Sequence, residues 1–311
     1  MNARAEAFER IGGRFEARVL EPSPPAVDSA PWYADDPVAR GDAPAGRQVV
    51  SPVGTGDLRW EALARDDAEL AEWCADRWLG AYRRLPDVPG KLVPTRLALH
   101  TLAERVISPA RRKANTKIAL RYTHGGFGTP FYGGDVQVRV VGTELIVQEA
   151  GTERRAPITT LNAAADHIGR DALPDDVKLG GEPLEVDPAA AAFLGEWYGF
   201  AASVLEELRA GAREELEPSR VQLWPEHFDL ALELGASDAG ERAAYGLSPG
   251  DELHPEPYLY VAPWVAPEPG ELWQASAFKG AELSYAELLR DPDQRGCALE
   301  FFSARLAALT A

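Results

Sequence analysis

Apolar side chains recur along this chain with two different spacings, and the spacing separates expected helices from expected strands. An apolar residue returns every four positions from 70 to 82, and a second apolar face runs from 99 to 106 and is ended by Pro109. The strongest helical pattern follows Asp187, which is placed to cap a helix whose apolar face runs through 188–208. These patterns predict three helices, the last of them long.

Three shorter helices are marked by their termini. Thr159 or Thr160 is expected to begin a helix that ends at Gly169. Ser284 and Glu287 have the spacing of a capping box, and Asp291, followed by proline, is expected to open the last helix.

Alternation of apolar and polar residues predicts an antiparallel sheet in the first half of the chain. The pattern covers 117–122 and 136–140, and Gly142-Thr143 then forms a two-residue hairpin turn of type II′ into 145–147. Another turn leads to a strand that ends at Ile158.

The second half repeats this order of a helix followed by strands. Strands are expected at 221–223, 228–234, 258–261 and 273–278, with a Gly/Ser/Asp-rich connection after the second of them. Strands that follow helices without strict alternation indicate an α+β fold of antiparallel sheets with packed helices.

The chain is expected to divide near residue 90. Residues 1–90 hold a Pro-rich arm or lid, mainly 21–57, and one helix, and 91–311 form an α+β domain. Its repeated order suggests two related halves, 91–186 and 187–311, which we hold as a hypothesis of duplication.

Charge and composition narrow the class of partner. The 49 acidic and 32 basic side chains give a net charge of −17, which repels nucleic acid and anionic membranes. No apolar run has the form of a signal peptide or a membrane span, and Cys74 and Cys297 are too far apart for a zinc ribbon. We therefore expect a cytoplasmic protein that binds neither nucleic acid nor membrane; the sequence leaves any cofactor and the oligomeric state unknown.

Ionisable side chains that suit catalysis concentrate near two of the expected strands. Strand periodicity from 227 to 234 places His227 and Asp229 on one face, and the same period from 254 to 264 places His254 and Glu256 together. If the strands are neighbours, these groups suit a general-base histidine held by a carboxylate, or a divalent metal. Their spacing matches no metal motif, so a solvated polar face remains the alternative.

Aromatic and basic residues near these positions are candidate binding residues. In the second half they are Trp224, Tyr245, Tyr258, Tyr260 and Trp264, and in the first half His124, Phe127 and Arg121. Tyr258 and Tyr260 also suit ordinary packing, because tyrosine commonly lines cores.

Two further segments have a chemical and a structural interpretation. The Gly-rich loop 125–134 lacks the Lys-Ser/Thr of a phosphate loop and precedes a strand, which favours a hairpin loop with an aromatic tip. The dense basic residues between 105 and 121 suit an anionic ligand, but helix C-termini ordinarily gather such charges.

Several short motifs, taken in order, carry a family resemblance. They are Leu99-His100-Thr101-Leu102, the Phe127–Tyr132 loop, His227-Phe228-Asp229-Leu230-Ala231, Ala244-Tyr245, and Pro-Glu-Pro-Tyr-Leu-Tyr at 255–260. Over about residues 92–306 the chain resembles a bacterial family known only as a domain of unknown function. It departs from that pattern in Trp224-Pro225-Glu226 and in its Pro-rich arm. The resemblance implies the domain limits and a bacterial origin, and it implies no catalytic residue.

Three functions fit these observations. The first is a small-molecule-binding protein or enzyme with a pocket lined by 224–229 and 254–264 and covered by 21–57. The second is a non-catalytic interaction or scaffold module that uses Trp32, Tyr33 and Trp264. The third is a metal-dependent hydrolase or isomerase.

Overall fold

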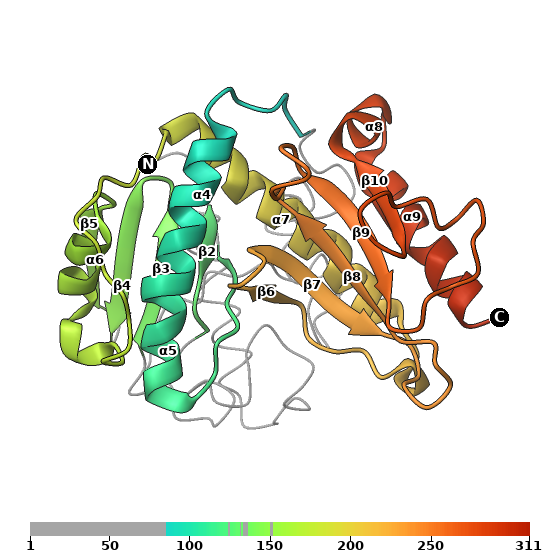
Figure 1. Cartoon of the computed structure of the whole chain (residues 1–311), viewed down its shortest axis with the longest axis horizontal. Coiled ribbons are helices and arrows are strands. Elements are labelled where there is room, and N and C mark those ends of the chain that lie inside the picture. Colours follow the sequence, from blue (N-terminus) through green and yellow to red (C-terminus); the bar gives the residue numbers. More distant parts are fainter. Residues whose placement is uncertain (1–84, 124, 131, 133–135, 150–151) are drawn as a thin grey trace, which may run out of the picture.

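The computed structural model describes residues 85–123, 125–130, 132, 136–149 and 152–311 (Figure 1). The expected arm at 21–57, the expected helix at 70–82, Cys74 and His124 lie outside these residues.

The first half of the described chain contains a five-stranded antiparallel sheet with sequential strand order. Its strands are β1 (Arg121–Thr123), β2 (Gly126–Gly128), β3 (Val136–Val141), β4 (Glu144–Glu149) and β5 (Thr152–Pro157). The turn between β3 and β4 is the expected one, with Gly142 at a φ of 57° and Val141 paired with Glu144. Glycine meets the positive φ of this turn without steric cost.

The second half contains another five-stranded antiparallel sheet, also with sequential order. Its strands are β6 (Gln222–Trp224), β7 (Asp229–Leu234), β8 (Ala243–Ser248), β9 (Tyr258–Pro263) and β10 (Ala281–Ser284). The expected strand at 273–278 is wrong, because that segment is a loop and the edge strand is β10. β8 was not predicted, since its small residues and internal glycine lack the usual strand composition. The two sheets with their helices nevertheless confirm the α+β fold.

The first helical segment is longer than its sequence pattern suggested. α4 (Leu92–Leu102) continues through a π-helical turn, η1 (Ala103–Ile107), into α5 (Ser108–Asn115). Pro109 was expected to end the helix, and that expectation is wrong. The amide of Ser108 bonds the carbonyl of Ala103, five residues back, and this wider turn accommodates a ring that clashes with the preceding turn of an ordinary α-helix.

The remaining helices confirm most of the expected caps. They are α6 (Leu161–Ile168), the 3₁₀ turns η2 (Arg170–Ala172) and η3 (Glu214–Leu216), α7 (Pro188–Gly211), α8 (Tyr285–Arg290) and α9 (Gln294–Leu309). Thr160 and Asp187 accept hydrogen bonds from the first turns of α6 and α7, and Ser284 forms the capping box of α8. The cap of α9 is Asp293 and not Asp291.

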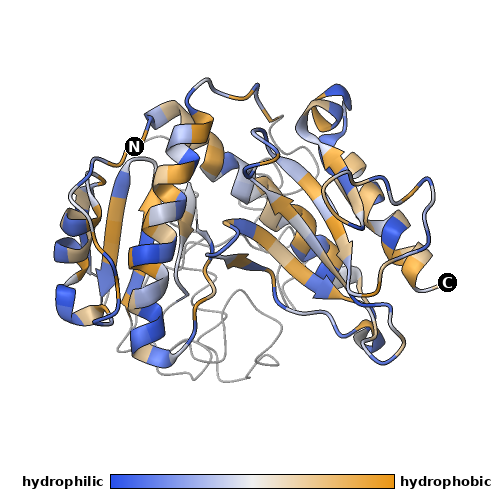
Figure 2. Ribbon diagram, viewed as in Figure 1, coloured by the Kyte–Doolittle hydropathy of each residue, from blue (hydrophilic) through white to orange (hydrophobic). Residues whose placement is uncertain are grey.

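Both sheets share one hydrophobic core. α7 contacts strands of each sheet, and the buried side chains of both halves belong to a single cluster. Figure 2 shows the hydrophobic colour concentrated on the strands and on the helix faces that meet them. A backbone bridge between Leu120 and Leu223 also links the two sheets directly.

Phe228 is the principal aromatic contact between the halves. Its backbone has a φ of 58°, and its carbonyl accepts a hydrogen bond of 2.7 Å from the Tyr198 hydroxyl. Its ring stacks on His100 at 5.1 Å and meets Phe127 edge-on at 5.0 Å. Rings from α4, β2 and α7 thus hold a backbone conformation that phenylalanine rarely adopts.

Among the described residues, no helix is both long enough and apolar enough to cross a membrane.

Candidate functional site

The sheet of β6–β10 has an apolar face and a polar face. Tyr245, Leu259 and Val261 are fully buried on the first, and helices α7 and α9 contact strands of this sheet. The register brings Ala231, Gly246, Tyr260 and Glu282 side by side on the second face, because directly paired residues point the same way.

Gly246 allows the Tyr260 ring to lie flat across strand β8. A Cβ atom at Gly246 would stand 2.5 Å from Cε1 of Tyr260, and closer still to Cζ and the hydroxyl oxygen. The ring therefore passes over the glycine toward β7, where its hydroxyl donates to Oδ2 of Asp229. One glycine thus permits a contact between side chains two strands apart.

Asp229 is a buried carboxyl group at the start of β7. It is 4% exposed, and its Oδ1 atom has no hydrogen-bond partner among the described residues. Burial raises the pKa of Asp229, which the hydrogen bond from Tyr260 and the nearby His227 partly oppose. Burial and the neighbouring Asp229 also raise the pKa of Tyr260.

His254 lies between two carboxylates at the other side of this face. Its Nδ1 is 3.1 Å from Oδ1 of Asp251, and its Nε2 is 3.4 Å from Oε2 of Glu282. The Tyr258 hydroxyl donates to Asp251 at 2.7 Å, and the His254 and Tyr258 rings are 4.3 Å apart. The hydrogen bonds from Tyr258 and from the His254 and Leu253 amides lower the pKa of Asp251 against the effect of its partial burial.

Arg96 of α4 holds the loop that carries Asp251 and His254. Its guanidinium group donates to the carbonyl oxygens of Pro249, Asp251, His254 and Pro255, at 3.0–3.5 Å. Arg96 is only 5% exposed, and burial lowers its pKa. A cation from the first half of the chain thereby fixes the 249–255 loop of the second.

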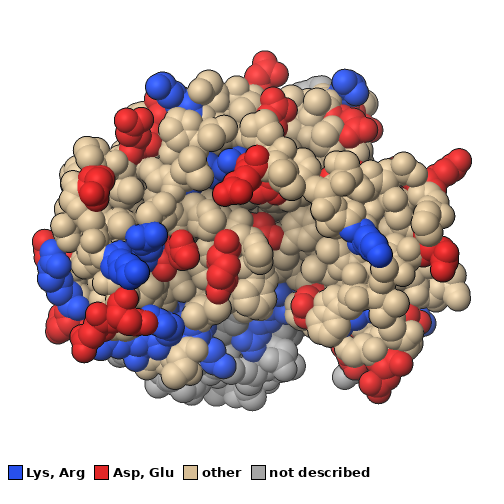
Figure 3. Space-filling model, viewed as in Figure 1, with Lys and Arg blue, Asp and Glu red and all other residues tan. Residues whose placement is uncertain are grey.

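His100, one turn further along α4, contacts the turn before Asp229. Its Nε2 is 2.8 Å from the carbonyl oxygen of Pro225, and its burial lowers its pKa. Both ends of the polar face are therefore attached to one helix. Figure 3 shows the molecule hollowed between this helix and the sheet of β6–β10, with mostly acidic side chains along the hollow.

The four candidate catalytic residues separate into two groups. Asp229 and His254 belong to the contacts described above, whereas His227 and Glu256 are exposed. The expectation that strand periodicity begins at 227 and 254 is wrong. Residues 225–228 form a turn, closed by the amide of Phe228 on the Trp224 carbonyl at 2.7 Å, so β7 begins only at Asp229.

β9 also begins later than expected, and the cause is again local. Pro255 and Pro257 have no amide hydrogen for a ladder, so β9 begins at Tyr258. His254 consequently lies in a loop, and it meets Glu282 from there.

The candidate binding residues of the second half lie in three environments. Tyr258 and Tyr260 line the polar face, and Trp224 lies half-buried at its β6 edge. Tyr245 points to the opposite face, where its ring meets Phe302 edge-on at 6.0 Å. Trp264 is 61% exposed at the end of β9.

The first half contributes little to this face. Phe127 is a core residue that contacts Phe228, and Arg121 is buried on β1. The basic segment is largely structural, since buried Arg111 donates to the carbonyl of Ala119 within its own region.

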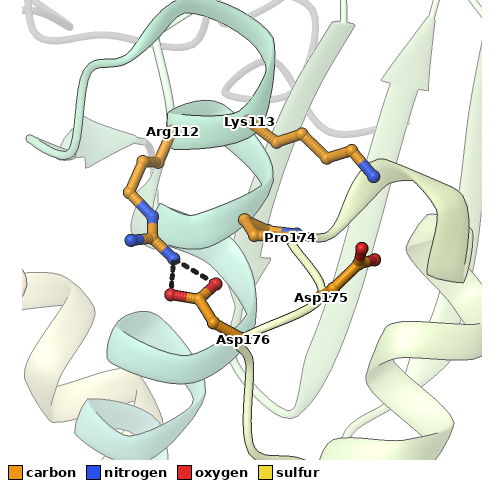
Figure 4. Close-up of a pocket in the computed structure, with 5 residues that line it drawn as sticks. All are labelled: Arg112, Lys113, Pro174, Asp175 and Asp176. Carbon is orange, nitrogen blue, oxygen red and sulfur yellow. Dashed lines mark hydrogen bonds and ion pairs between the residues drawn. The ribbon is translucent and has the colours of Figure 1, made fainter.

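A shallow depression of about 380 Å³ lies beside the basic segment (Figure 4). Arg112 pairs there with Asp176 at 2.9 Å, and Lys113 donates to the carbonyl of Leu173 at 2.8 Å. Both cations of this depression thus already have partners within the chain, which argues against a role for them in holding an anionic ligand.

Sequence reasoning missed four residues of the site: Arg96, Gly246, Asp251 and Glu282. Only Asp251 carried a local signal, as an acidic residue three positions before His254. Gly246 and Glu282 acquire their roles through strand order, and Arg96 through packing of the two halves.

Within the described part of the chain, no group of three His, Cys, Asp or Glu side chains is placed to hold a metal ion. The metal-dependent interpretation therefore gains no support from the donor geometry.

Comparison with known proteins gives this site no precedent. No protein-family model matches the chain, and no curated protein or solved structure is significantly similar to it. The resemblance to a domain of unknown function therefore stays a prediction, and the interpretation of the site depends on its own chemistry.

Proposed function

We propose that this chain is a small-molecule-binding protein and that its ligand binds on the polar face of β7–β10, next to Asp229. The observation that carries the proposal is the buried Asp229 carboxyl group, one oxygen of which lacks a hydrogen-bond partner in the described structure. Leaving such a group unpaired costs about 1–3 kcal/mol, and more when it is charged. A ligand that donates a hydrogen bond to this oxygen recovers that free energy.

The surroundings of Asp229 suit a site close to the surface. Exposed Glu226 and His227 precede it and are near enough to affect its pKa. Tyr260 holds the other carboxyl oxygen, so the orientation of the group is fixed before a ligand arrives. A preorganised polar group set among aromatic rings is typical of small-molecule sites.

The test is a ligand screen that compares three proteins by thermal denaturation. The wild type is screened with a library of common metabolites beside Asp229→Asn, and beside Glu300→Gln, a matched loss of an exposed charge on α9. We expect at least one compound to raise the melting temperature of the wild type and of Glu300→Gln but not that of Asp229→Asn. Equal stabilisation of all three proteins, or of none by any compound, would contradict the proposal.

A second candidate function is protein interaction, which the exposed side chains after β9 favour. Trp264 and Val265 are 61% and 60% exposed, and Arg242 lies over the Trp264 ring at 5.5 Å. Aromatic and arginine side chains are enriched in interface cores. We expect Trp264→Ser to lose any partner that co-purifies with the tagged wild type. A partner that the variant retains would remove Trp264 from such an interface.

A further inference from the structure

The polar face offers hydrogen-bond acceptors more than donors. One of its buried atoms, Oδ1 of Asp229, has no hydrogen-bond partner in the described residues, and we call it the open acceptor; Oε2 of Glu282 lies 3.4 Å from Nε2 of His254 instead. The tyrosine hydroxyls of this face are already engaged: Tyr260 donates to Asp229, and Tyr258 donates to Asp251. A complementary ligand must therefore bring its own N–H or O–H groups.

Nearby cations of the protein are also occupied. Arg96 donates to loop carbonyl groups, and Arg242 pairs with Glu233 at 3.2 Å and contacts backbone carbonyls. Negative charge on this face thus comes from Asp229, Asp251 and Glu282, with His254 between the last two.

A row of aromatic rings lies on the same face as the open acceptor. The Tyr258 and Tyr260 rings are 6.1 Å apart, and Phe278 meets Tyr260 edge-on at 6.3 Å. His254 extends the row, with its ring 4.3 Å from that of Tyr258. A cation over such faces is attracted by the negative charge of the ring π-systems.

We propose that the ligand of this site is a small organic cation with N–H donors, an amine or a guanidine. This inference rests on the proposed function and names its ligand class. Asp229 is the decisive group, because it is more than nine-tenths buried and its Oδ1 atom has no hydrogen-bond partner in the described residues. A neutral alcohol supplies the hydrogen bond without the charge, and an anion is repelled by the carboxylates and by the net charge of −17.

The experiment uses probe sets that share a skeleton and differ in charge. 2-Phenylethylamine, 2-phenylethanol and phenylacetate form one set, and 1,4-diaminobutane, 1,4-butanediol and succinate form the other. Affinities are measured by calorimetry on the full chain at 0.15 M and 0.5 M salt, with Asp229→Asn, Glu282→Gln and Glu300→Gln. We expect the cation of at least one set to bind at least tenfold more tightly than its neutral and anionic counterparts.

The variants distinguish a specific cation site at Asp229 from a general attraction of cations to an acidic protein. Asp229→Asn should weaken the cation at least tenfold and Glu282→Gln should weaken it measurably, while Glu300→Gln leaves it unchanged. If all variants bind the cation alike, or if 0.5 M salt abolishes binding, the attraction is nonspecific and the inference is wrong.

The remaining outcomes distinguish this inference from the proposed function. A neutral or anionic probe that binds best and depends on Asp229 would overturn the ligand class and leave the binding site standing. Cationic probes that fail to bind would overturn the inference. If the metabolite screen also shows no compound that depends on Asp229, the proposed function fails as well.

Discussion

The contact between Gly246 and Tyr260 predicts an unusual double-mutant result. Gly246→Ala places a methyl group where the Tyr260 ring lies, and the ring must leave the sheet surface. Its hydrogen bond to Asp229 is then lost. The variant tests whether this glycine is present to make room for the ring.

The magnitude follows from three opposing effects. Overpacking costs about 1–3 kcal/mol, and the lost hydrogen bond to a carboxyl group about 1.5–3 kcal/mol. Replacement of glycine by alanine within a strand stabilises the folded state by roughly 0.5–1 kcal/mol, because alanine has less backbone freedom to lose on folding. We expect a net loss of about 1.5–5.5 kcal/mol in the free energy of unfolding.

The assay is urea denaturation of the wild type, Gly246→Ala, Tyr260→Ala and the double variant, followed by tryptophan fluorescence. Tyr260→Ala removes the three atoms nearest to the methyl group added at position 246, so Gly246→Ala should be neutral or stabilising by up to about 1 kcal/mol on the Tyr260→Ala background. An equal loss on both backgrounds would refute the reasoning, because the methyl group would then clash with something other than the ring.

Three further predictions concern charge and loop position. Burial raises the folded pKa of Asp229 above its ordinary value of 3.8, so ionisation of this carboxyl group disfavours folding as the pH rises past that value. Denaturation curves should therefore show Asp229→Asn to be more stable than the wild type at pH 7, and the difference should disappear below about pH 3.8. A difference that persists below that pH would contradict the assignment. Burial lowers the folded pKa of His100 below 6.5, so the unfolded chain takes up a proton first as the pH falls, and the stability of the fold declines below pH 6.5. His100→Asn should remove that part of the pH dependence of stability. An unchanged dependence of stability on pH would count against this role of His100. Arg96→Lys replaces the planar guanidinium group with a single ammonium group that cannot reach the same carbonyl oxygens. Amide hydrogen exchange in 249–255 should then accelerate at least tenfold. Unchanged exchange would show that other contacts hold this loop.

Local signals in the sequence were sufficient for much of the fold. The cap at Asp187 and the capping box at Ser284 involve residues two or three positions apart, so sequence alone specifies them. The turn at Gly142 is equally local. These elements established the order of helices and antiparallel strands, and hence the α+β class.

Features that depend on distant partners could not be predicted in this way. Pro109 remains inside a helical segment because the preceding turn widens, and β10 is a strand because it pairs with β9. His227 and Asp229 looked like members of one strand face until the turn at 225–228 separated them. Alternation of side chains along a strand predicts which residues share a face, but it does not predict the residue at which the backbone pairing with the next strand begins.

The candidate site shows the same division. Asp229, His254, Tyr258 and Tyr260 were selected from the sequence because ionisable and aromatic residues gather there, but their mutual contacts follow from strand order. Tyr260 reaches Asp229 only because β8 lies between β9 and β7 and carries Gly246 at the crossing.

The bridge between Leu120 and Leu223 also bears on self-association. The inner edge strands β1 and β6 are only three residues long, and this bridge turns them toward each other instead of toward solvent. At the outer edges, β5 carries three consecutive charged residues (153–155), and β10 spans only four residues. Short or charged edges pair poorly with strands of another molecule, so within the described part of the chain this strand arrangement protects both sheets from aggregating edge to edge.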